Sequence, residues 1–172
     1  MQTKQNVISF DIDGTLCDHF DGTENPHKRE VRDWAKRLKR RGYDVYIITR
    51  RFGPEFPEQG ATNEHLKVFK LAKELGIPED RIIFTNREWK HFFVKKIGAC
   101  IHIDDEIDER IFMESYHPDA KVIWLGDSNW SDLLIYEIED HDGFKIWFSN
   151  EENILKVGMA IALMLLYTLF FL

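Results

Sequence analysis

Short apolar segments alternate with longer amphipathic segments along most of the chain, and this alternation limits the fold more than any other feature. The apolar segments are too hydrophobic for strands that face water, and the amphipathic segments repeat apolar residues at helical spacing. Strands that alternate with helices through short loops form a parallel sheet with right-handed crossovers. We therefore predict an α/β fold, a Rossmann-like open parallel sheet flanked by helices. The predicted strands begin at Val7 and cover 43–49, 81–85, 99–103 and 121–125.

The segments between these strands carry helical patterns. Asn25 and Pro26 are typical of an N-cap and a first helical residue. In the second helix, Leu66 and Phe69 are expected to face the core, and Asp142-Gly143 predicts a hairpin within residues 128–148. The loop at 50–60 contains prolines and glycines and should run over the surface. The predicted helices cover 26–41, 62–75, 87–97 and 106–116.

Composition places the chain among globular proteins. It has 172 residues, of which 44% are hydrophobic, so one domain with a real core is the simplest expectation and the composition disfavours disorder. We predict that this domain covers residues 1–148. Cys17 and Cys100 have no secretory signal peptide ahead of them, which favours a reduced domain that faces the cytosol.

Residues 7–16 join a buried-strand pattern to two carboxylates. The apolar run ends at Asp11 and Asp13, and Gly14 permits a sharp turn directly after them. Residues i and i+2 of a strand face the same side, so both carboxylates converge on one metal ion or phosphorus atom if the extended conformation persists. Thr15 can then hold the second carboxylate by a hydrogen bond. This pattern predicts a catalytic edge of the sheet.

Other polar residues also end predicted strands. Thr49 ends the second strand, and Asp104 and Asp105 follow the fourth. In open parallel sheets, the functional crevice lies outside the carboxyl ends of the strands. We therefore expect these side chains to lie near Asp11 and Asp13.

Together these residues resemble the haloacid dehalogenase superfamily of phosphohydrolases. The first motif of that family, Asp-x-Asp-Gly-Thr after an apolar strand, matches residues 11–15 at every position, and its second, a strand-ending Ser or Thr, matches Thr49. Its third is a helical lysine, for which Lys90 is the first choice and Lys95 the reserve. Its fourth is an acidic pair that ends a strand, as at 104–105. The resemblance covers about residues 7–125.

The resemblance implies catalytic roles that agree with the chemistry of phosphoryl transfer, where positioning and electrostatics dominate. Asp11 would be the nucleophile and form an aspartyl-phosphate. Asp13 would protonate the leaving oxygen and later deprotonate the attacking water. Thr49 and Lys90 would bind the phosphoryl oxygens.

The same resemblance implies a magnesium site. The Asp11 carboxylate, the Asp13 backbone carbonyl and the acidic pair offer the hard oxygen ligands that Mg²⁺ prefers. Asp104 is the first choice for the direct metal ligand, and Asp105 is expected to lie just outside the direct ligands. The sequence does not separate these two adjacent residues. A calcium loop is disfavoured because a strand precedes the motif and further acidic residues at loop spacing are absent.

Several of these residues also have a purely structural explanation. His102 lies inside a predicted buried strand, where a satisfied core histidine is the more common case. His19 and Phe20 are candidates for a flap over the site. Lysines on an exposed helix face, among them Lys95, are usually only solvated.

No gap between the motifs is long enough for a cap domain, which many members of the family place over small substrates. An open site suits macromolecular ends, phosphoproteins, lipid phosphates, nucleotides, or small molecules enclosed by oligomerisation. Arg50 and Arg51 directly follow Thr49 and are placed to contact a substrate phosphate. Residues 28–41 carry eight basic side chains and could follow nucleic-acid or membrane phosphates. Glu30 and Asp33 interleave with them, so a solvated helix face is favoured over nucleic acid.

Residues 149–172 predict a separate C-terminal helix. Ser149 and Glu152 form a capping-box pattern, and residues 157–172 are apolar on every side. A helix starting at Ile154 spans about 28 Å if Lys156 extends to the interface, close to the ~30 Å of a bilayer core. We favour a tail anchor that leaves the catalytic domain facing the cytosol. A buried or oligomer-forming helix in a soluble cytoplasmic protein is the alternative.

The sequence thus predicts a magnesium-dependent phosphomonoester hydrolase tethered to a membrane. A soluble nucleotidase or polynucleotide end-phosphatase is the second hypothesis. A non-catalytic binding or scaffold protein that keeps the fold is the third. Retention of every motif residue favours an enzyme over the scaffold, while the substrate and the oligomeric state stay open.

Overall fold

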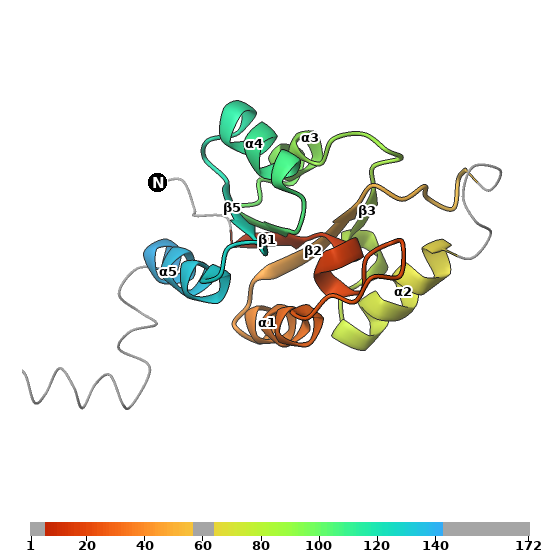
Figure 1. Ribbon diagram of the computed structural model, residues 1–172, viewed down its shortest axis with the longest axis horizontal. Coiled ribbons are helices and arrows are strands. Elements are labelled where there is room, and N and C mark those ends of the chain that lie inside the picture. Colours follow the sequence, from red (N-terminus) through yellow and green to blue (C-terminus); the bar gives the residue numbers. More distant parts are fainter. Residues whose placement is uncertain (1–5, 57–63, 143–172) are drawn as a thin grey trace, which may run out of the picture. The chain divides into compact units, whose positions relative to one another are not determined.

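The computed structural model describes residues 6–56 and 64–142 (Figure 1). Five parallel strands form one open sheet in the order β3-β2-β1-β4-β5, which confirms the predicted class. The chain adds strands on one side of β1 and then returns to the other side with β4. The carboxyl ends of β1 and β4 therefore flank the point where the strand order reverses, the usual crevice of such sheets. The strands are β1 (Val7–Phe10), β2 (Asp44–Thr49), β3 (Ile82–Phe84), β4 (Ile101–Asp104) and β5 (Lys121–Trp124).

Helices cover both faces of this sheet, as predicted. Figure 1 shows α1 and α2 on one face and α3 and α4 on the other. The chain divides into two compact units, Met1–Trp130 and Ser131–Leu172, and all five strands belong to the first. The helices are α1 (Lys28–Arg40), α2 (Glu64–Leu75), α3 (His91–Ile97), α4 (Ile107–Tyr116) and α5 (Trp130–Asp142).

The core lies along the central strands and the inner stripes of the helices. Ile8 and Phe10 of β1 are fully buried, which explains why this strand shows a continuous apolar run rather than alternation. In α1 the buried residues recur at helical spacing, from Val31 to Leu38, so its charged residues lie on the opposite stripe. Removing a buried side chain of this size costs about 2–5 kcal/mol.

The segment before α3 differs from the prediction. A helix was expected from residue 87, but α3 begins at His91. Asn86 and Arg87 both have positive φ, and the Thr85 hydroxyl donates to the Glu88 carbonyl at 2.7 Å, so a tight turn occupies this segment. Since neither turn residue is glycine, the residue types at these positions do not indicate the turn.

Three smaller predictions are wrong. Leu66 is exposed, and Val68 takes its place on the buried stripe of α2. The predicted hairpin at 128–148 is contradicted by α5, because Trp130, Leu134 and Ile138 recur at helical rather than alternating spacing. Asn25 does not cap α1. Its side chain accepts a hydrogen bond from the His27 amide and donates to the Thr15 carbonyl, and the helix begins two residues later than expected.

Segments between the strands bear on the question of a cap domain. Among the described residues, no helix or strand lies between residues 17 and 27, and α2 is the longest element between β2 and β3. The predicted helix at 149–172 lies outside the described residues. Within the ranges that the structure does describe, we find no helix with the length and hydrophobicity needed to cross a bilayer.

Candidate active site

Strand register places two of the predicted carboxylates side by side. Phe10 of β1 lies opposite Ile103 of β4, and the Asp11 amide donates to the Ile103 carbonyl at 2.9 Å. Asp11 and Asp104 each follow these paired residues, so they lie at the same level of the sheet edge. Both are buried, with 3% and 0% of their surface exposed.

Asp105 completes an acidic cluster with this pair. One carboxylate oxygen from each of Asp11, Asp104 and Asp105 lies within 4.8 Å of the others. The Thr15 hydroxyl donates to Asp105 Oδ1 at 3.2 Å, and His19 Nδ1 lies 3.2 Å from Asp105 Oδ2. Thr15 therefore supports Asp105, whereas the sequence led us to expect a bond to Asp13. Three oxygen donors at this spacing fit a hard divalent cation such as Mg²⁺.

Lys90 reaches into the same cluster from the turn before α3. Its Nζ lies 2.7 Å from Asp11 Oδ1 and 2.8 Å from Asp104 Oδ2, and its side chain is 2% exposed. Its backbone amide donates to both carboxylate oxygens of Glu109, at 3.3 and 3.2 Å, which fixes the start of α3. Lys95 is exposed on α3. Of the two lysines considered from the sequence, the structure brings Lys90 to the carboxylates.

Asp104 is held by groups on three sides. Its Oδ2 also lies 2.9 Å from His102 Nε2, while the amide of Glu106 donates to its Oδ1 at 2.9 Å. His102 Nδ1 lies 2.8 Å from the Ser9 hydroxyl. Burial lowers the pKa of His102, so a neutral imidazole donates to Asp104. The prediction that His102 is a satisfied core histidine is confirmed, and its role is to orient Asp104.

The charges in this cluster do not balance. Burial opposes ionisation of Asp104, but Lys90 and His102 outweigh it and hold the pKa of Asp104 below its usual range. Burial raises the pKa of Asp11 well above its ordinary value, despite the attraction of Lys90. Burial and the charge of Asp104 raise the pKa of Asp105 to about 6. One lysine ammonium group thus faces three carboxylates, and a bound cation would neutralise the excess negative charge.

Asp13 takes part in a different group of charges. Arg51 Nε donates to Asp13 Oδ2 at 2.9 Å and its Nη2 donates to Asp13 Oδ1, while its Nη1 donates to Glu64 Oε2 at 2.6 Å. The strand ends at Phe10, and residues Ile12–Leu16 form a tight turn. Since the extended conformation does not persist, the Asp13 carboxylate is not part of the acidic cluster.

Gly14 makes this turn feasible. It adopts φ +71°, which disfavours any side chain, and a Cβ here would collide with the Asp105 carboxylate and the His19 imidazole. The motif glycine therefore allows the second carboxylate of the acidic pair to approach the backbone of the first motif.

Thr49 ends β2, the strand next to β1, and Arg50 directly follows it. Thr49 is fully buried at the end of β2, and its hydroxyl accepts a hydrogen bond from the Arg51 amide at 3.3 Å. The Arg50 guanidinium lies 4.7 Å from the centroid of the Trp89 ring and 3.4 Å from Glu106. Both arginines predicted to contact a substrate thus already have partners within the chain.

Sequence reasoning missed Glu109, Glu64 and Trp89. Glu109 is fully buried and its pKa is raised to about 7 by burial. A signal for Glu109 did exist, since it precedes buried Met113 by four residues on the inner stripe of α4, where an acidic residue is unusual. Glu64 and Trp89 carried no such signal, because each is identified only by the arginine that it contacts.

The fold and the site define an α/β protein with a lysine-bridged acidic cluster at the carboxyl edge of a parallel sheet. A scan against protein-family models finds no match to this sequence. A search of curated proteins finds no significant match either. Residues and geometry therefore carry the functional argument.

Proposed function

We propose that this protein is a magnesium-dependent phosphomonoester hydrolase that acts through an aspartyl-phosphate on Asp11. The observation that carries the proposal is the buried ammonium group of Lys90, held between Asp11 and Asp104 where β1 and β4 end. A fixed cation next to a carboxylate nucleophile suits phosphoryl transfer, in which the charge on the phosphoryl oxygens must be matched.

Each step of the proposed reaction has a residue for it. An Asp11 carboxylate oxygen attacks phosphorus in line, and the bond from phosphorus to the leaving oxygen breaks. Lys90 and the Thr49 hydroxyl bind the phosphoryl oxygens. Asp13 gives its proton to the leaving oxygen and later takes one from the water that hydrolyses the acyl-phosphate. Because Arg51 binds Asp13 through both carboxylate oxygens, this contact must loosen when Asp13 carries the proton.

The acidic cluster supports the metal requirement. Asp11, Asp104 and Asp105 would hold Mg²⁺, with the Asp13 carbonyl as a further ligand expected from the family resemblance. When bound, the ion supplies positive charge that neutralises the phosphoryl oxygens. Thr15 and His102 would keep the carboxylates in place through the hydrogen bonds described above.

The decisive experiment measures phosphate release from an aryl phosphate by the full chain in detergent, with Mg²⁺ and with EDTA. We expect magnesium-dependent turnover that Asp11→Asn abolishes. Asp33→Asn, which removes an exposed carboxylate on α1, serves as the matched control and should retain full activity. Turnover that survives Asp11→Asn would exclude Asp11 as the nucleophile. Absence of turnover in a folded chain that binds magnesium would favour the scaffold hypothesis.

The proposal also includes a substrate class and a membrane location, and the location depends on residues outside the described ranges. Since the described ranges hold no element longer than α2 between β2 and β3, a lipid, nucleotide or protein phosphate fits better than a substrate that needs a cap domain. Membrane attachment is supported by the sequence of residues 157–172 alone. Partition of the chain into detergent micelles, compared with a chain ending at residue 148, would test it.

A further inference from the structure

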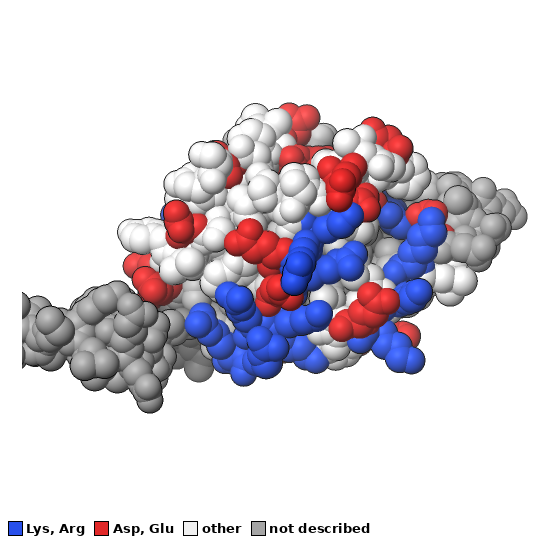
Figure 2. Space-filling model, turned by 60° about the horizontal axis from the view of Figure 1, so that its bottom comes forward, with Lys and Arg blue, Asp and Glu red and all other residues white. Residues whose placement is uncertain are grey.

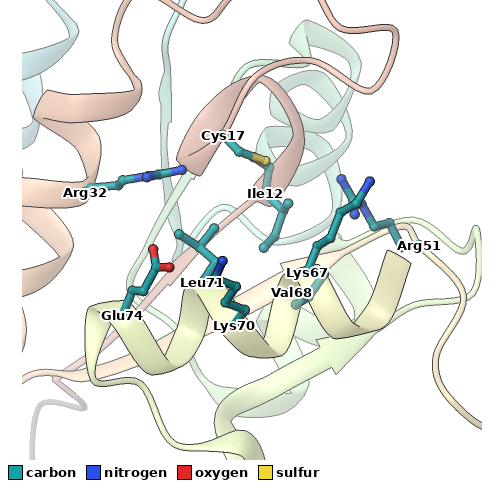
Figure 3. Close-up of a pocket in the computed structure, with 9 residues that line it drawn as sticks. All are labelled: Ile12, Cys17, Arg32, Arg51, Lys67, Val68, Lys70, Leu71 and Glu74. Atoms are coloured by element: carbon teal, nitrogen blue, oxygen red, sulfur yellow. The ribbon is translucent and has the colours of Figure 1, made fainter. Parts of the chain in front are cut away.

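A cleft lies along α2, facing the turn at Ile12–Leu16 and Arg32 of α1 (Figure 3). It shares Arg51 with the candidate site, and its other lining residues have no step in the proposed reaction. Its volume is about 240 Å³. Ile12, Val68 and Leu71 contribute apolar surface, whereas its polar lining comes mainly from cationic side chains: Arg32, Arg51, Lys67 and Lys70, opposed by Glu74. An apolar interior with a cationic lining suits a ligand that carries both apolar surface and negative charge.

The cations differ in how far they are already neutralised. Arg51 is paired with Asp13 and Glu64, and Lys67 with Glu64. Arg32 donates through Nε to the Leu16 carbonyl, a neutral partner, at 2.6 Å. Among the described residues, Lys70 has no ion pair and is exposed on α2. Arg32 and Lys70 therefore leave the two sides of the cleft with positive charge.

The positive surface continues beyond the cleft along α1. Lys36 and Lys39 follow Arg32 at helical spacing, and within the described residues Lys36 has no ion pair. Lys73 follows Lys70 on α2. Figure 2, which brings this side of the molecule forward, shows Lys and Arg side chains gathered over it and fewer Asp and Glu. The thirteen residues of α1 span about 20 Å, a length that matches several phosphates of a polymer.

We propose that the cleft and the adjoining basic stripe of α1 and α2 bind the backbone of a single-stranded nucleic acid. A cleft of this volume holds one sugar-phosphate unit with part of its base, but not a duplex. The charges along α1 then contact the following phosphates. This weighs against the solvated-face interpretation because two helices supply unneutralised cations to one concave site.

A membrane surface fits these observations less well. Peripheral helices that bind bilayers insert exposed apolar side chains beside their basic ones. The apolar residues of α1, from Val31 to Leu38, are all buried, and Leu66 is the exposed large hydrophobic residue of α2. The basic stripe can therefore contact phosphates but offers little to insert between lipids.

The test is binding of a fluorescent twenty-nucleotide oligothymidine with hydroxyl ends, followed by anisotropy with the full chain in EDTA. Without a terminal phosphate or metal, the measurement is independent of hydrolysis, so it can fail while the proposed function stands, and the reverse. Lys36→Glu with Lys70→Glu should weaken binding about tenfold or more at 0.1 M salt. Three phosphate contacts predict a slope of log affinity against log salt of about −2, which the double variant should reduce by about 1.4.

Lys95→Glu with Lys96→Glu is the matched control. It makes the same charge change on α3, which covers the other face of the sheet (Figure 1), and should alter affinity less than twofold. Equal losses in both variants would overturn the proposal, as would a wild-type chain that fails to bind. Circular dichroism checks that both variants fold.

A parallel arm uses vesicles of phosphatidylserine and phosphatidylcholine. The proposal would fail if the Lys36 and Lys70 variant lost vesicle binding but bound the oligonucleotide as well as the wild-type chain does. The surface would then be a membrane contact. Unchanged vesicle binding, together with the loss of oligonucleotide binding, supports it.

Discussion

Two groups of charges meet at the candidate site, and they differ in burial. The inner group, Lys90 with Asp11 and Asp104, has side chains that are 2%, 5% and 0% exposed. The outer group, Arg51 with Asp13 and Glu64, has side chains that are 11%, 23% and 21% exposed. Water can replace a lost partner in the outer group but not in the inner one. The inner group is therefore fixed by the fold, whereas the outer group can exchange partners.

This difference matches the proposed division of labour. A nucleophile and a cation that bind the phosphoryl group gain from being held in place before the substrate arrives. A residue that gives and takes a proton has to change its hydrogen bonds during the reaction, as Asp13 would. The following predictions test whether the two groups differ in this way, beginning with the largest expected effect.

Removing the inner cation should have the largest effect. In Lys90→Met, Asp11 and Asp104 remain buried without their partner, and leaving buried charge unpaired costs about 3–5 kcal/mol. We expect that loss in the free energy of unfolding, measured with urea at pH 7.5, together with loss of turnover. Lys95→Met, on the exposed side of α3, should change stability by less than about 0.5 kcal/mol. Similar values for both variants would show that the inner group is not a stabilising unit.

Metal binding should favour the folded chain through the acidic cluster. At a Mg²⁺ concentration about one hundred times its dissociation constant, the free energy of unfolding should rise by about 2.7 kcal/mol. Asp105→Asn should remove most of this gain, because one of the three clustered carboxylates is lost. Asp119→Asn, an exposed residue between α4 and β5, should keep it. Equal responses to Mg²⁺ in both variants would place the ion elsewhere.

The inner group was largely foreseeable from the sequence, for a topological reason. Parallel strands end at one edge, so the residues at the ends of β1 and β4 had to meet there, and the apolar runs indicated where these strands end. The lysine was harder, since Lys90 and Lys95 lie on one short segment. A turn with positive φ at Asn86 and Arg87 decides between them, and the identity of these residues does not signal that conformation.

The outer group could not be foreseen in the same way. Arg51 was expected to contact a substrate, because its sequence position next to Thr49 shows closeness to the site but not its partner. The turn at Ile12–Leu16 takes Asp13 out of the extended strand and allows Arg51 to bind it. Because β1 ends at Phe10, Asp11 stays in the acidic cluster and Asp13 does not, and the sequence pattern does not resolve where the strand ends.

Glu109 should make stability depend on pH. Burial raises its pKa to about 7 from an ordinary value of 4.5, so the stability contributed by its protonated form is fully present below about pH 4.5 and is lost as pH rises through 7. Relative to Glu109→Gln, the wild-type chain should lose about 2 kcal/mol of unfolding free energy between pH 5 and 8. Glu114→Gln, at an exposed position of α4, should run parallel to wild type. Parallel curves for all three would show that Glu109 titrates normally.

The smallest effect on stability is expected in the outer group, where it would separate stability from activity. Arg51→Lys keeps the positive charge but loses the two-point contact with Asp13. Because these side chains are partly exposed, unfolding free energy should change by about 1 kcal/mol or less. Turnover of the aryl phosphate should nevertheless fall about tenfold, since a misplaced proton donor loses much of the gain from general acid catalysis.

The control is Lys67→Met, which removes the other cation paired with Glu64 and leaves the Arg51 contact with Asp13 intact. It should match wild type in both stability and turnover. A large loss of unfolding free energy in Arg51→Lys would show that the outer charges are as fixed as the inner ones. Replacing one partner of an ion pair has a large effect on stability only when the pair is rigidly held. Unchanged turnover would instead mean that Asp13 does not need Arg51 for its placement. A fall in turnover at nearly constant stability is the result expected if the inner charges are fixed by burial and the partly exposed outer charges can exchange partners.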